Sequence, residues 1–435
     1  MQHDAIVIGA GAAGLAAARA FAEAGRSAVI VEARDRIGGR AWTQVLDGFP
    51  RPVELGAEFV HGRPAATWDV LRESGLVAYD VGGDRWRRRG RHLRKADERD
   101  DPNAVMAKLR IRRRDESFAD ALLANAGRMP RADLALARSF VEGFDAAHAE
   151  LVSARSIAEE QEGLGNVNEE PQSRLLEGYG SLLQWIHDGA VRAGATLRLS
   201  WPVRSIAWER GSVRVSGPKG TLQARTAIVT LPVGVLQSAD VTFEPEVPRM
   251  RSAVALLGAG SATKVMLAFR EPFWERGVPR APRQFGGFGF LFDPTGPLPT
   301  WWSGLPLHVP VLTGWAGGPK SDALSGLPES NVVDRAVASL AGLLGIPARR
   351  LTGMLVAGRC HDWQSDPWSK GAYSYVRVGG ANARKDLARP VEGTLFFAGE
   401  AADTGDQAST VAGAIASGQA AAKAALTSRR PSRRR

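Results

Sequence analysis

Apolar and polar positions at the start of the chain follow the pattern of a β-α-β unit. The apolar run at residues 5–8 predicts a buried parallel strand, and the Ala-rich stretch after it predicts a helix that continues to about residue 24. A second apolar run at 27–31 predicts the next strand.

Further along the chain the pattern changes from helical to strand-like. Residues 103–160 favour helices, and we assign one apolar helical face to the core rather than to a binding site. That face consists of Leu134, Ala137, Phe140, Val141 and Phe144. Strands are predicted at 196–200, 203–208, 212–217, 224–231 and 263–269. Aromatic and proline-rich loops at 271–302 and a helix at 331–344 follow, and the last 40 residues return to a buried strand and an Ala-rich helix.

The turn between the first strand and the first helix carries glycines in the spacing G-x-G-x-x-G. Gly9 allows the tight turn, Gly11 removes a Cβ that would block a pyrophosphate, and Gly14 lets the helix lie close to its strand. The helix N-terminus then faces the anion. Glu32 ends the second strand 18 positions after Gly14, where it can accept hydrogen bonds from ribose hydroxyls. The unit therefore predicts dinucleotide binding.

The segment that follows Glu32 favours FAD over NAD. Residues 33–40 add two glycines, for another close backbone approach, and an arginine that can clamp a phosphate bidentately. This segment resembles the glutathione-reductase-like FAD proteins. The expected fold class is α/β, with a Rossmann-type FAD-binding domain and a discontinuous α+β substrate domain.

The net charge of +10 is concentrated in two segments. Residues 84–116 carry a net charge of +6 and the tail 429–435 carries +5, so the rest of the chain is nearly neutral. We expect 85–95 to be an exposed loop and 427–435 to be a disordered basic tail. Neither segment carries a platform of interleaved aromatic residues, since Trp86 stands alone among the arginines, so a polyanion-binding module remains only an alternative.

Cysteine content and apolar runs limit the other classes of protein. Cys360 is the single cysteine, which excludes an intramolecular disulfide and a cysteine cluster for a metal, and no metal site is expected. No apolar run reaches the roughly 20 residues of a membrane span, and the first strand begins too early to leave room for a signal peptide. We therefore expect a cytoplasmic enzyme.

Motifs across nearly the whole chain resemble the flavin-dependent amine oxidase family. After the nucleotide turn they are, in order, GGRAWT (38–43), ELGAEFVHG (54–62), EGYGSLLQWI (177–186), VTLPVGVLQ (229–237), TKVMLAF (263–269) and DWQSDPWSKGAYSY (362–375), which continues to LFFAGEAAD (395–403). The resemblance implies an FAD domain of residues 1–64, 174–243 and 390–426. It implies a substrate domain of residues 65–173 and 244–389, with the pocket at the junction.

By this resemblance, Lys264 is the residue expected to support the chemistry. The family's matching lysine holds a water against flavin N5, and a cation there also favours electron transfer to O2. In the strand 263–269, Lys264 shares one face with Met266 and Ala268. A lysine on the wet face of a half-buried strand is the alternative interpretation.

Aromatic residues of the motif at 362–375 form the second expected cluster. By resemblance Trp363 lies near the flavin edge, and Tyr373 walls the cavity in front of the ring, where a dry site favours the neutral amine. Ala372 replaces the cysteine that bonds to flavin in monoamine oxidases, which implies noncovalent FAD. Thr410 replaces their second cage tyrosine, which puts a two-ring aromatic cage in doubt.

The carboxyl end is expected to complete the cofactor site. Gly399 and Glu400 can reach the ribityl chain, and Ser409 or Thr410 can cap a helix whose N-terminus points at the flavin pyrimidine ring. The backbone at Val203 is expected to meet adenine. The full set of expected cofactor residues is Gly9, Gly11, Ala13, Gly14, Glu32, Arg34, Gly39, Arg40, Gly56, Ala57, Val203, Trp363, Gly399, Glu400, Thr410 and Val411.

The substrate is expected to be a small amine or polyamine. His61 matches the histidine that faces the substrate amine in animal polyamine oxidases, so Lys264, Tyr373 and His61 are the expected catalytic residues. Acidic residues can anchor a distal ammonium group or merely form a solvated face. They are Glu58, Glu159, Glu160 and Glu162. The expected reaction is hydride transfer to flavin N5 and reoxidation by O2 to give H2O2. A flavin desaturase, a protoporphyrinogen-oxidase-like enzyme and an L-amino acid oxidase are the alternatives.

Overall fold

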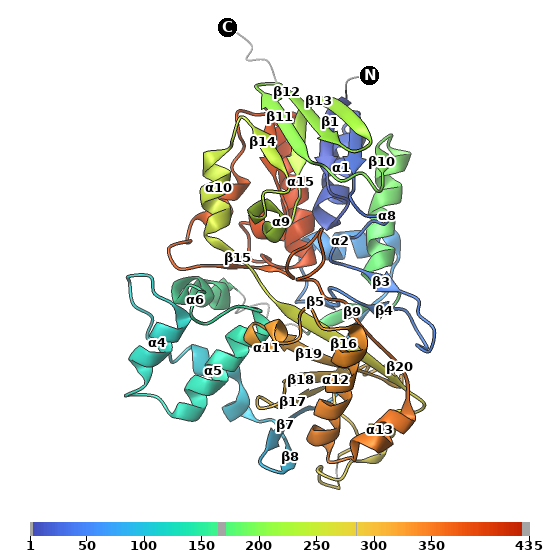
Figure 1. Ribbon diagram of the computed structural model, residues 1–435, viewed down its shortest axis with the longest axis vertical. Coiled ribbons are helices and arrows are strands. Elements are labelled where there is room, and N and C mark those ends of the chain that lie inside the picture. Colours follow the sequence, from blue (N-terminus) through green and yellow to red (C-terminus); the bar gives the residue numbers. More distant parts are fainter. Residues whose placement is uncertain (1–2, 164–170, 284, 429–435) are drawn as a thin grey trace.

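The computed structural model describes residues 3–163, 171–283 and 285–428. The basic tail from residue 429 onward lies outside this range, so its predicted disorder is not tested. Figure 1 shows a large sheet at one end of the molecule and a second large sheet at the other end. The helices α4 (Phe118–Asn125), α5 (Arg131–Phe144) and α6 (Ala154–Gly163) lie beside the second sheet.

The first sheet has eight strands and contains the predicted β-α-β unit. Its order is β10 (Thr196–Arg198), β2 (Ala28–Val31), β1 (His3–Ile8), β13 (Gly220–Val229), β12 (Ser212–Gly217), β11 (Ser205–Glu209) and β14 (Thr242–Glu244), and β22 (Leu395–Phe397) also pairs with β13. β1 pairs in parallel with both β2 and β13. Successive residues of β1 enter two different apolar clusters, one on each face, which is why the strand is apolar throughout.

Helices cover the faces of this sheet. α1 (Ala12–Glu23), α2 (Ala65–Ser74), α8 (Tyr179–Arg192) and α15 (Val411–Thr427) share one cluster. α9 (Val233–Gln237), α10 (Pro248–Ala255) and α14 (Ala383–Ala388) contribute to the other cluster. A Cβ on Gly418 of α15 would lie 2.1 Å from the Ala13 carbonyl oxygen of α1, so glycine is required for the close approach of these two helices.

The second sheet has seven strands. Its order is β20 (Leu355–Cys360), β16 (Ala262–Phe269), β19 (Val311–Gly317), β18 (Thr300–Ser303), β17 (Phe290–Phe292), β7 (Arg85–Arg89) and β8 (His92–Lys95). α12 (Glu329–Leu344) and α13 (Ala348–Met354) pack on it. β16 is buried at every position, so the alternative interpretation, a half-buried strand with Lys264 on a wet face, is wrong.

The prediction of an exposed loop at 85–95 is also wrong, because these residues form the hairpin β7–β8 at the edge of the second sheet. Trp86 and Leu93 are buried in the core of that sheet, and Gly90 supplies a positive φ of 59° at the turn. Carboxylates pair with the flanking cations, for example Asp100 with Arg94 at 2.6 Å. Since arginines occupy most positions, the two apolar residues gave too weak a pattern to predict a strand.

Shorter elements connect the two large sheets. β5 (Phe59–Val60), β9 (Ser173–Leu175) and β6 (Ala78–Asp80) form a three-stranded sheet, while β3 (Thr43–Gln44) pairs with β4 (Val53–Glu54) and β15 (Leu257–Ala259) with β21 (Ser374–Val376). Further helices are α3 (Pro102–Met106) and α11 (Pro319–Asp322). No helix within the described residues has the length and apolar composition needed to cross a bilayer.

Candidate functional site

A continuous cavity of about 1220 Å³ is lined by residues of both large sheets. This volume exceeds the roughly 300–1,000 Å³ of a pocket for one small molecule, so it can hold a dinucleotide and a second ligand together. Every residue that we expect to be catalytic or to bind the cofactor lines this cavity, except Gly14. The described residues contain no group of three metal-ligating side chains.

The glycine turn has the geometry that the motif predicts. Gly9 has a positive φ of 106°, and a Cβ on Gly14 would lie 1.9 Å from the Gly9 carbonyl oxygen. Gly14 therefore permits helix packing and does not face the cavity. A Cβ on Gly11 would have only the Gly38 carbonyl oxygen near it, at 4.0 Å, so this glycine leaves open a space beside the cavity.

Glu32 connects the turn to the second strand. Its Oε2 accepts a hydrogen bond of 2.7 Å from the Ala10 backbone N–H, and its Oε1 accepts one of 2.9 Å from the Arg34 N–H. A carboxylate has further lone pairs, so Glu32 can still accept from a ligand hydroxyl. Val203 lines the same end of the cavity.

Two helices begin at the cavity wall. Gly11 precedes α1, and Thr410 caps α15 by accepting a hydrogen bond of 3.1 Å from the Gly413 N–H. This result confirms the predicted cap. Both N-termini line the cavity, and their free N–H groups and dipoles favour an anion there.

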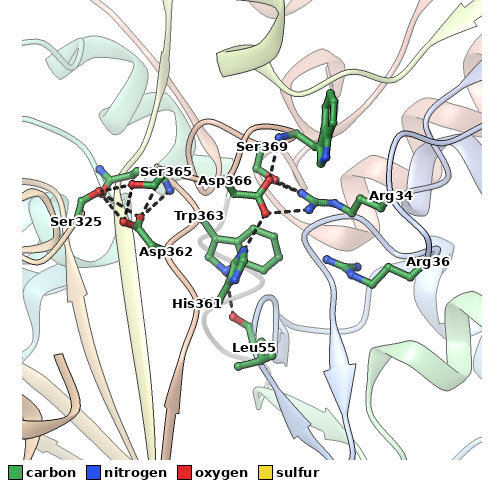
Figure 2. A network of polar contacts seen from close by, with 12 residues as sticks. Arg34, Arg36, Leu55, Ser325, His361, Asp362, Trp363, Ser365, Asp366 and Ser369 are labelled. Carbon is green, nitrogen blue, oxygen red and sulfur yellow. Dashed lines mark hydrogen bonds and ion pairs between the residues drawn. The ribbon is translucent and has the colours of Figure 1, made fainter. Parts of the chain in front are cut away.

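Arg34 is held by a carboxylate that the sequence analysis did not single out. Its guanidinium makes two hydrogen bonds to Asp366, of 2.8 and 2.7 Å, and a third to Ser369, as Figure 2 shows. His361 Nε2 also lies 2.8 Å from Asp366. Burial alone would raise the pKa of Asp366, but the hydrogen bonds from His361 and Arg34 hold this pKa well below its ordinary value. The Arg34 fork is therefore occupied, and this side chain holds the 361–369 segment against the first domain's loop.

Arg40 and Glu400 form a second ion pair across the cavity, at 2.9 Å. The second oxygen of Glu400 accepts a hydrogen bond of 2.6 Å from the Ser374 hydroxyl. Burial would raise the pKa of Glu400, yet the nearby Arg40 and Arg384 lower it, so the carboxylate is ionised at neutral pH.

Lys264 is almost completely buried, with 3% of its side chain exposed, and it lines the cavity. Its ammonium donates a 2.7 Å hydrogen bond to the Gly56 carbonyl and a 3.0 Å hydrogen bond to Glu58. Glu58, which we had considered for a distal ammonium group, therefore binds this lysine instead. Met266 and Ala268 share a core cluster separate from that of Val265 and Leu267, which confirms the predicted division of β16 into two faces.

Aromatic side chains cover the cavity near Lys264. Tyr373 stacks on Trp315 with ring centroids 6.5 Å apart, and Trp315 lies 6.1 Å from Trp302. The position of both tryptophans at the cavity was not predicted, since nothing in their local sequence pattern separates them from core residues. Phe144 lines the cavity and is 39% exposed, so its assignment to the core is wrong. Phe140 also lines the cavity, but it packs, like Leu134, against the core cluster that contains the buried Ala137 and Val141.

Trp363 and His61 lie on the cavity wall with limited freedom. The Trp363 indole N–H donates a 3.0 Å hydrogen bond to the Leu55 carbonyl, and a Cβ on Gly56 would lie 3.2 Å from the Trp363 ring. Burial lowers the pKa of His61 to about 4, so this imidazole is neutral at neutral pH. Gln172 lies 3.2 Å from its Nδ1.

Asp145 and Glu160 place two further carboxyl groups on the cavity wall. Asp145 Oδ2 is buried and has no hydrogen-bond partner among the described residues. Burial, and then the nearby Glu160, raise the pKa of Asp145 well above its ordinary value. Burial also raises the pKa of Glu160, whose closest cation, Arg384, lies 3.8 Å away. Glu162 is exposed, as a solvated face would be, while Glu159 is exposed and also lines the cavity.

Comparison with known proteins identifies the family. A family model described as flavin containing amine oxidoreductase matches residues 12–426. The chain belongs to this family. It is 30% identical to polyamine oxidase 4 of Oryza sativa subsp. japonica, over 96% of this chain and 87% of that protein. It is 28% identical to human lysine-specific histone demethylase 2, over 96% of this chain but only 52% of that protein.

Solved structures of two oxidases share the fold. Putrescine oxidase in its putrescine-bound form superposes with a TM-score of 0.81 at 22% identity, covering 98% of this chain and 99% of that one. Cyclohexylamine oxidase from Brevibacterium oxydans IH-35A superposes with a TM-score of 0.82 at 21% identity and the same coverage. The predicted α/β architecture and the predicted family are thereby confirmed.

Membership of the family makes this protein an FAD-dependent amine oxidase. The residues present fit the cofactor, because the space left open at Gly11 and the two helix N-termini suit a pyrophosphate. Glu32 suits a ribose. The cavity continues from this end to Lys264 and the aromatic wall, where a flavin ring and a substrate have room.

Proposed function

We propose that this enzyme oxidises a diamine or polyamine and passes the electrons to O2. The observation that carries the proposal is the buried Asp145 carboxyl oxygen, which has no hydrogen-bond partner in the part of the chain that the structure describes and lies with Glu160 on the wall of the same cavity as Lys264 and Tyr373. A second ammonium group of the substrate would supply the missing partner. The printed names of the relatives, polyamine oxidase and putrescine oxidase, support the same substrate class.

FAD, when bound, would supply the redox chemistry: hydride transfer from the amine α-carbon would leave an imine for hydrolysis to a carbonyl product, and O2 would take the electrons to give H2O2. The residues of this chain bind, orient and desolvate the reactants. The aromatic wall excludes water, which disfavours the charged ammonium and favours the neutral amine that can react. Tyr373 and neutral His61 shape this space, and Lys264 provides the buried cation beside the reacting atoms.

We assign the cofactor roles from the positions of the residues on the cavity wall. Gly9, Gly11, Ala13 and the N-terminus of α1 would hold the pyrophosphate, and Glu32 the ribose, with the Val203 backbone at the adenine. Arg34, Gly39 and Arg40, together with Gly56, Ala57 and Trp363, would line the flavin. Gly399, Glu400, Thr410 and Val411 would hold the ribityl chain and the pyrimidine edge. Ala372 lines the cavity and offers no thiol, which supports noncovalent FAD.

The proposal also covers the domain boundaries, the location in the cell and the possibility of an amino acid substrate. The strands of the eight-stranded sheet fall in the expected segments 1–64, 174–243 and 390–426, except that β14 extends one residue beyond. Because α2, α10 and α14 pack on this sheet, we extend the FAD domain to include 65–74, 244–255 and 383–389. The free Cys360 thiol is compatible with a cytoplasmic location. Arg34 and Arg40 of the cavity wall are already paired with carboxylates, so neither of these two is free to bind a substrate carboxylate.

A comparison of matched substrates and matched variants tests the substrate class. Asp145→Asn and Glu160→Gln should lower kcat/KM for a linear diamine about 10- to 100-fold, because a charge-assisted contact is lost. Turnover of a monoamine of equal length should change less than about threefold. Glu162→Gln, on the same helix as Glu160 but exposed and not part of the cavity wall, is the control and should change neither. Equal losses for both substrates in the Asp145 variant would reject the distal site.

A further inference from the structure

Glu58 lies between two buried cations. Its Oε2 accepts a hydrogen bond of 3.0 Å from Lys264, and its Oε1 accepts one of 2.7 Å from Arg174 Nε. The exposed fractions of the three side chains are 3% for Lys264, 15% for Glu58 and 7% for Arg174. The Trp302 indole N–H donates a further 3.0 Å hydrogen bond to Oε1. A buried carboxylate with this many donors is fixed in position.

Arg174 is itself anchored away from the cavity. Its Nη2 donates a 3.1 Å hydrogen bond to the Ser303 carbonyl at the end of β18, and its guanidinium lies 4.7 Å from the centre of the Phe59 ring. Burial would raise the pKa of Glu58, but Lys264 and Arg174 lower it below the ordinary value. The group therefore holds one anion between two cations, with a net charge of +1.

Glu58 also determines where the Lys264 ammonium points. An ammonium has three N–H donors, and the Gly56 carbonyl and Glu58 accept two of them. The third donor is left for the cavity that Lys264 lines. A change at Glu58 therefore alters both the direction of this donor and the charge beside it.

We propose that Glu58, held by Arg174, is a positioning residue that orients Lys264 and sets the electrostatic field at the reactive edge of the flavin. This inference rests on the proposed function, in which Lys264 lies beside that edge. Reduced flavin carries a negative charge. A more positive net charge on Glu58, Lys264 and Arg174 together therefore stabilises the reduced flavin, and a less positive net charge destabilises it.

The sign of each effect follows from the charge that remains. Glu58→Gln leaves two cations and should shift the reduction equilibrium of bound FAD toward the reduced form. Arg174→Met and Lys264→Met each leave a neutral pair and should shift it toward the oxidised form. The double variant Glu58→Gln/Arg174→Met again has a charge of +1 and should lie close to the unmodified enzyme.

The midpoint potential of the bound flavin, measured by anaerobic dye-coupled titration of the holoenzyme, is the readout. Each single variant should shift the two-electron reduction equilibrium at least about tenfold, which corresponds to about 30 mV. Burial raises the pKa of the neighbouring Glu54 to about 7. Titration at about pH 8.5 therefore keeps Glu54 ionised.

Two control variants separate charge from packing. Arg174→Lys keeps the charge and should leave the equilibrium within about twofold of the unmodified enzyme. Asp293→Asn breaks another buried ion pair of the second sheet, with Arg88 at 2.8 Å, and should not alter the flavin potential. FAD retention, measured from the ratio of flavin to protein absorbance, shows that each variant is compared as holoenzyme.

The outcomes distinguish this inference from the proposed function. Opposite shifts for Glu58→Gln and Arg174→Met, with recovery in the double variant, support the inference, since a packing defect would move both in one direction and accumulate. A shift in Lys264→Met alone would overturn the role of Glu58 while keeping that of Lys264. An unchanged potential in all of these variants would overturn both.

Discussion

Lys264 and Trp315 are directly opposite each other on the neighbouring antiparallel strands β16 and β19. Opposite residues of such a pair place their side chains on the same face of a sheet, so the cation and the indole enter the cavity together. The other face of β16 packs Val265 and Leu267 into the core. The proposed catalytic cation is therefore carried by an internal strand that is paired on both sides, where small displacements are resisted.

Replacement of this cation gives the first prediction. Lys264→Met should retain FAD but slow reoxidation of the reduced enzyme by O2 about 100-fold, because the buried positive charge at the reacting atoms is lost. Stopped-flow absorbance after anaerobic reduction measures this step. Met266→Leu, on the same face of β16 and within the core, is the control. Reoxidation at the unmodified rate in the Lys264 variant would remove the role we assign to this residue.

The glycine turn gives a prediction about packing. A Cβ on Gly14 would lie 1.9 Å from the Gly9 carbonyl oxygen, so Gly14→Ala must displace α1 from β1. We expect the free energy of unfolding to fall by about 1–3 kcal/mol and FAD to bind more weakly. Gly127→Ala is the matched control, because a Cβ there has no atom of the described residues within 4 Å beyond its immediate chain neighbours. Thermal unfolding and flavin fluorescence measure the two effects, and a Gly14 variant as stable as the control would contradict the geometry.

The sequence was sufficient for those parts of the site that depend on local chemistry. The glycine spacing, the position of Glu32 and the Thr410 cap each depend on a few neighbouring residues, and the structure has them where the motif predicts. Lys264 could be placed on a face of its strand because alternation has a period of two. Its burial could not be predicted, since that depends on both neighbouring strands.

Contacts between distant segments were not predictable from the sequence. Glu58 and Arg174 are 116 positions apart, and Arg34 and Asp366 are 332 apart, so no local spacing relates them. Trp315 reaches the site through the register of β16 with β19, which one sequence does not specify. The hairpin β7–β8 was missed for a different reason, because its arginines dominate the composition while only Trp86 and Leu93 carry the burial signal.

The ion pair of Arg34 with Asp366 gives a prediction about acid stability. The pKa of the Asp366 carboxyl is lower in the folded protein than in the unfolded chain. The ion pair therefore stabilises the fold above the ordinary carboxyl pKa, and this stabilisation is lost as pH falls through the pKa of the folded protein. Asp366→Asn should lower the free energy of unfolding by about 3–5 kcal/mol at neutral pH, because Arg34 stays buried without its partner. The difference between variant and unmodified protein should shrink as pH falls below about 4.

Chemical denaturation between neutral and acidic pH tests this dependence. Glu23→Gln removes the exposed partner of Arg19 and should cost less than about 1 kcal/mol at any pH. A pH-independent difference for Asp366→Asn would show that lost packing, rather than the ionised carboxylate, causes the destabilisation.

Cys360 is expected to be inert in the folded enzyme. Burial, and then the neighbouring Glu329 and Asp362, raise the pKa of its thiol to about 12. At pH 8 only about one thiol in ten thousand is then ionised, and the thiolate is the reactive form. Ellman's reagent should therefore react with the native protein far more slowly than with the denatured protein, which supplies the control. Rapid modification of the native protein would contradict the burial of this thiol.

The last prediction concerns the pH dependence of substrate binding. Burial and the nearby Glu160 raise the pKa of Asp145, so the free enzyme holds a proton there, while a bound ammonium group would favour the ionised carboxylate. Binding of a diamine should therefore release this proton, and its affinity should increase as pH rises toward the pKa of Asp145 in the free enzyme. A monoamine of the same length lacks the second ammonium group and should not share this dependence.

The ratio of the two KM values isolates this effect, because ionisation of the reacting nitrogen is common to both substrates. We expect the ratio of diamine to monoamine KM to fall with increasing pH in the unmodified enzyme and to become flat in Asp145→Asn. Steady-state oxygen consumption across the pH range of stability provides both constants. A ratio that still falls with pH in the Asp145 variant would assign the titration to another group, with Glu160→Gln as the next variant to measure, since burial raises its pKa in the same direction.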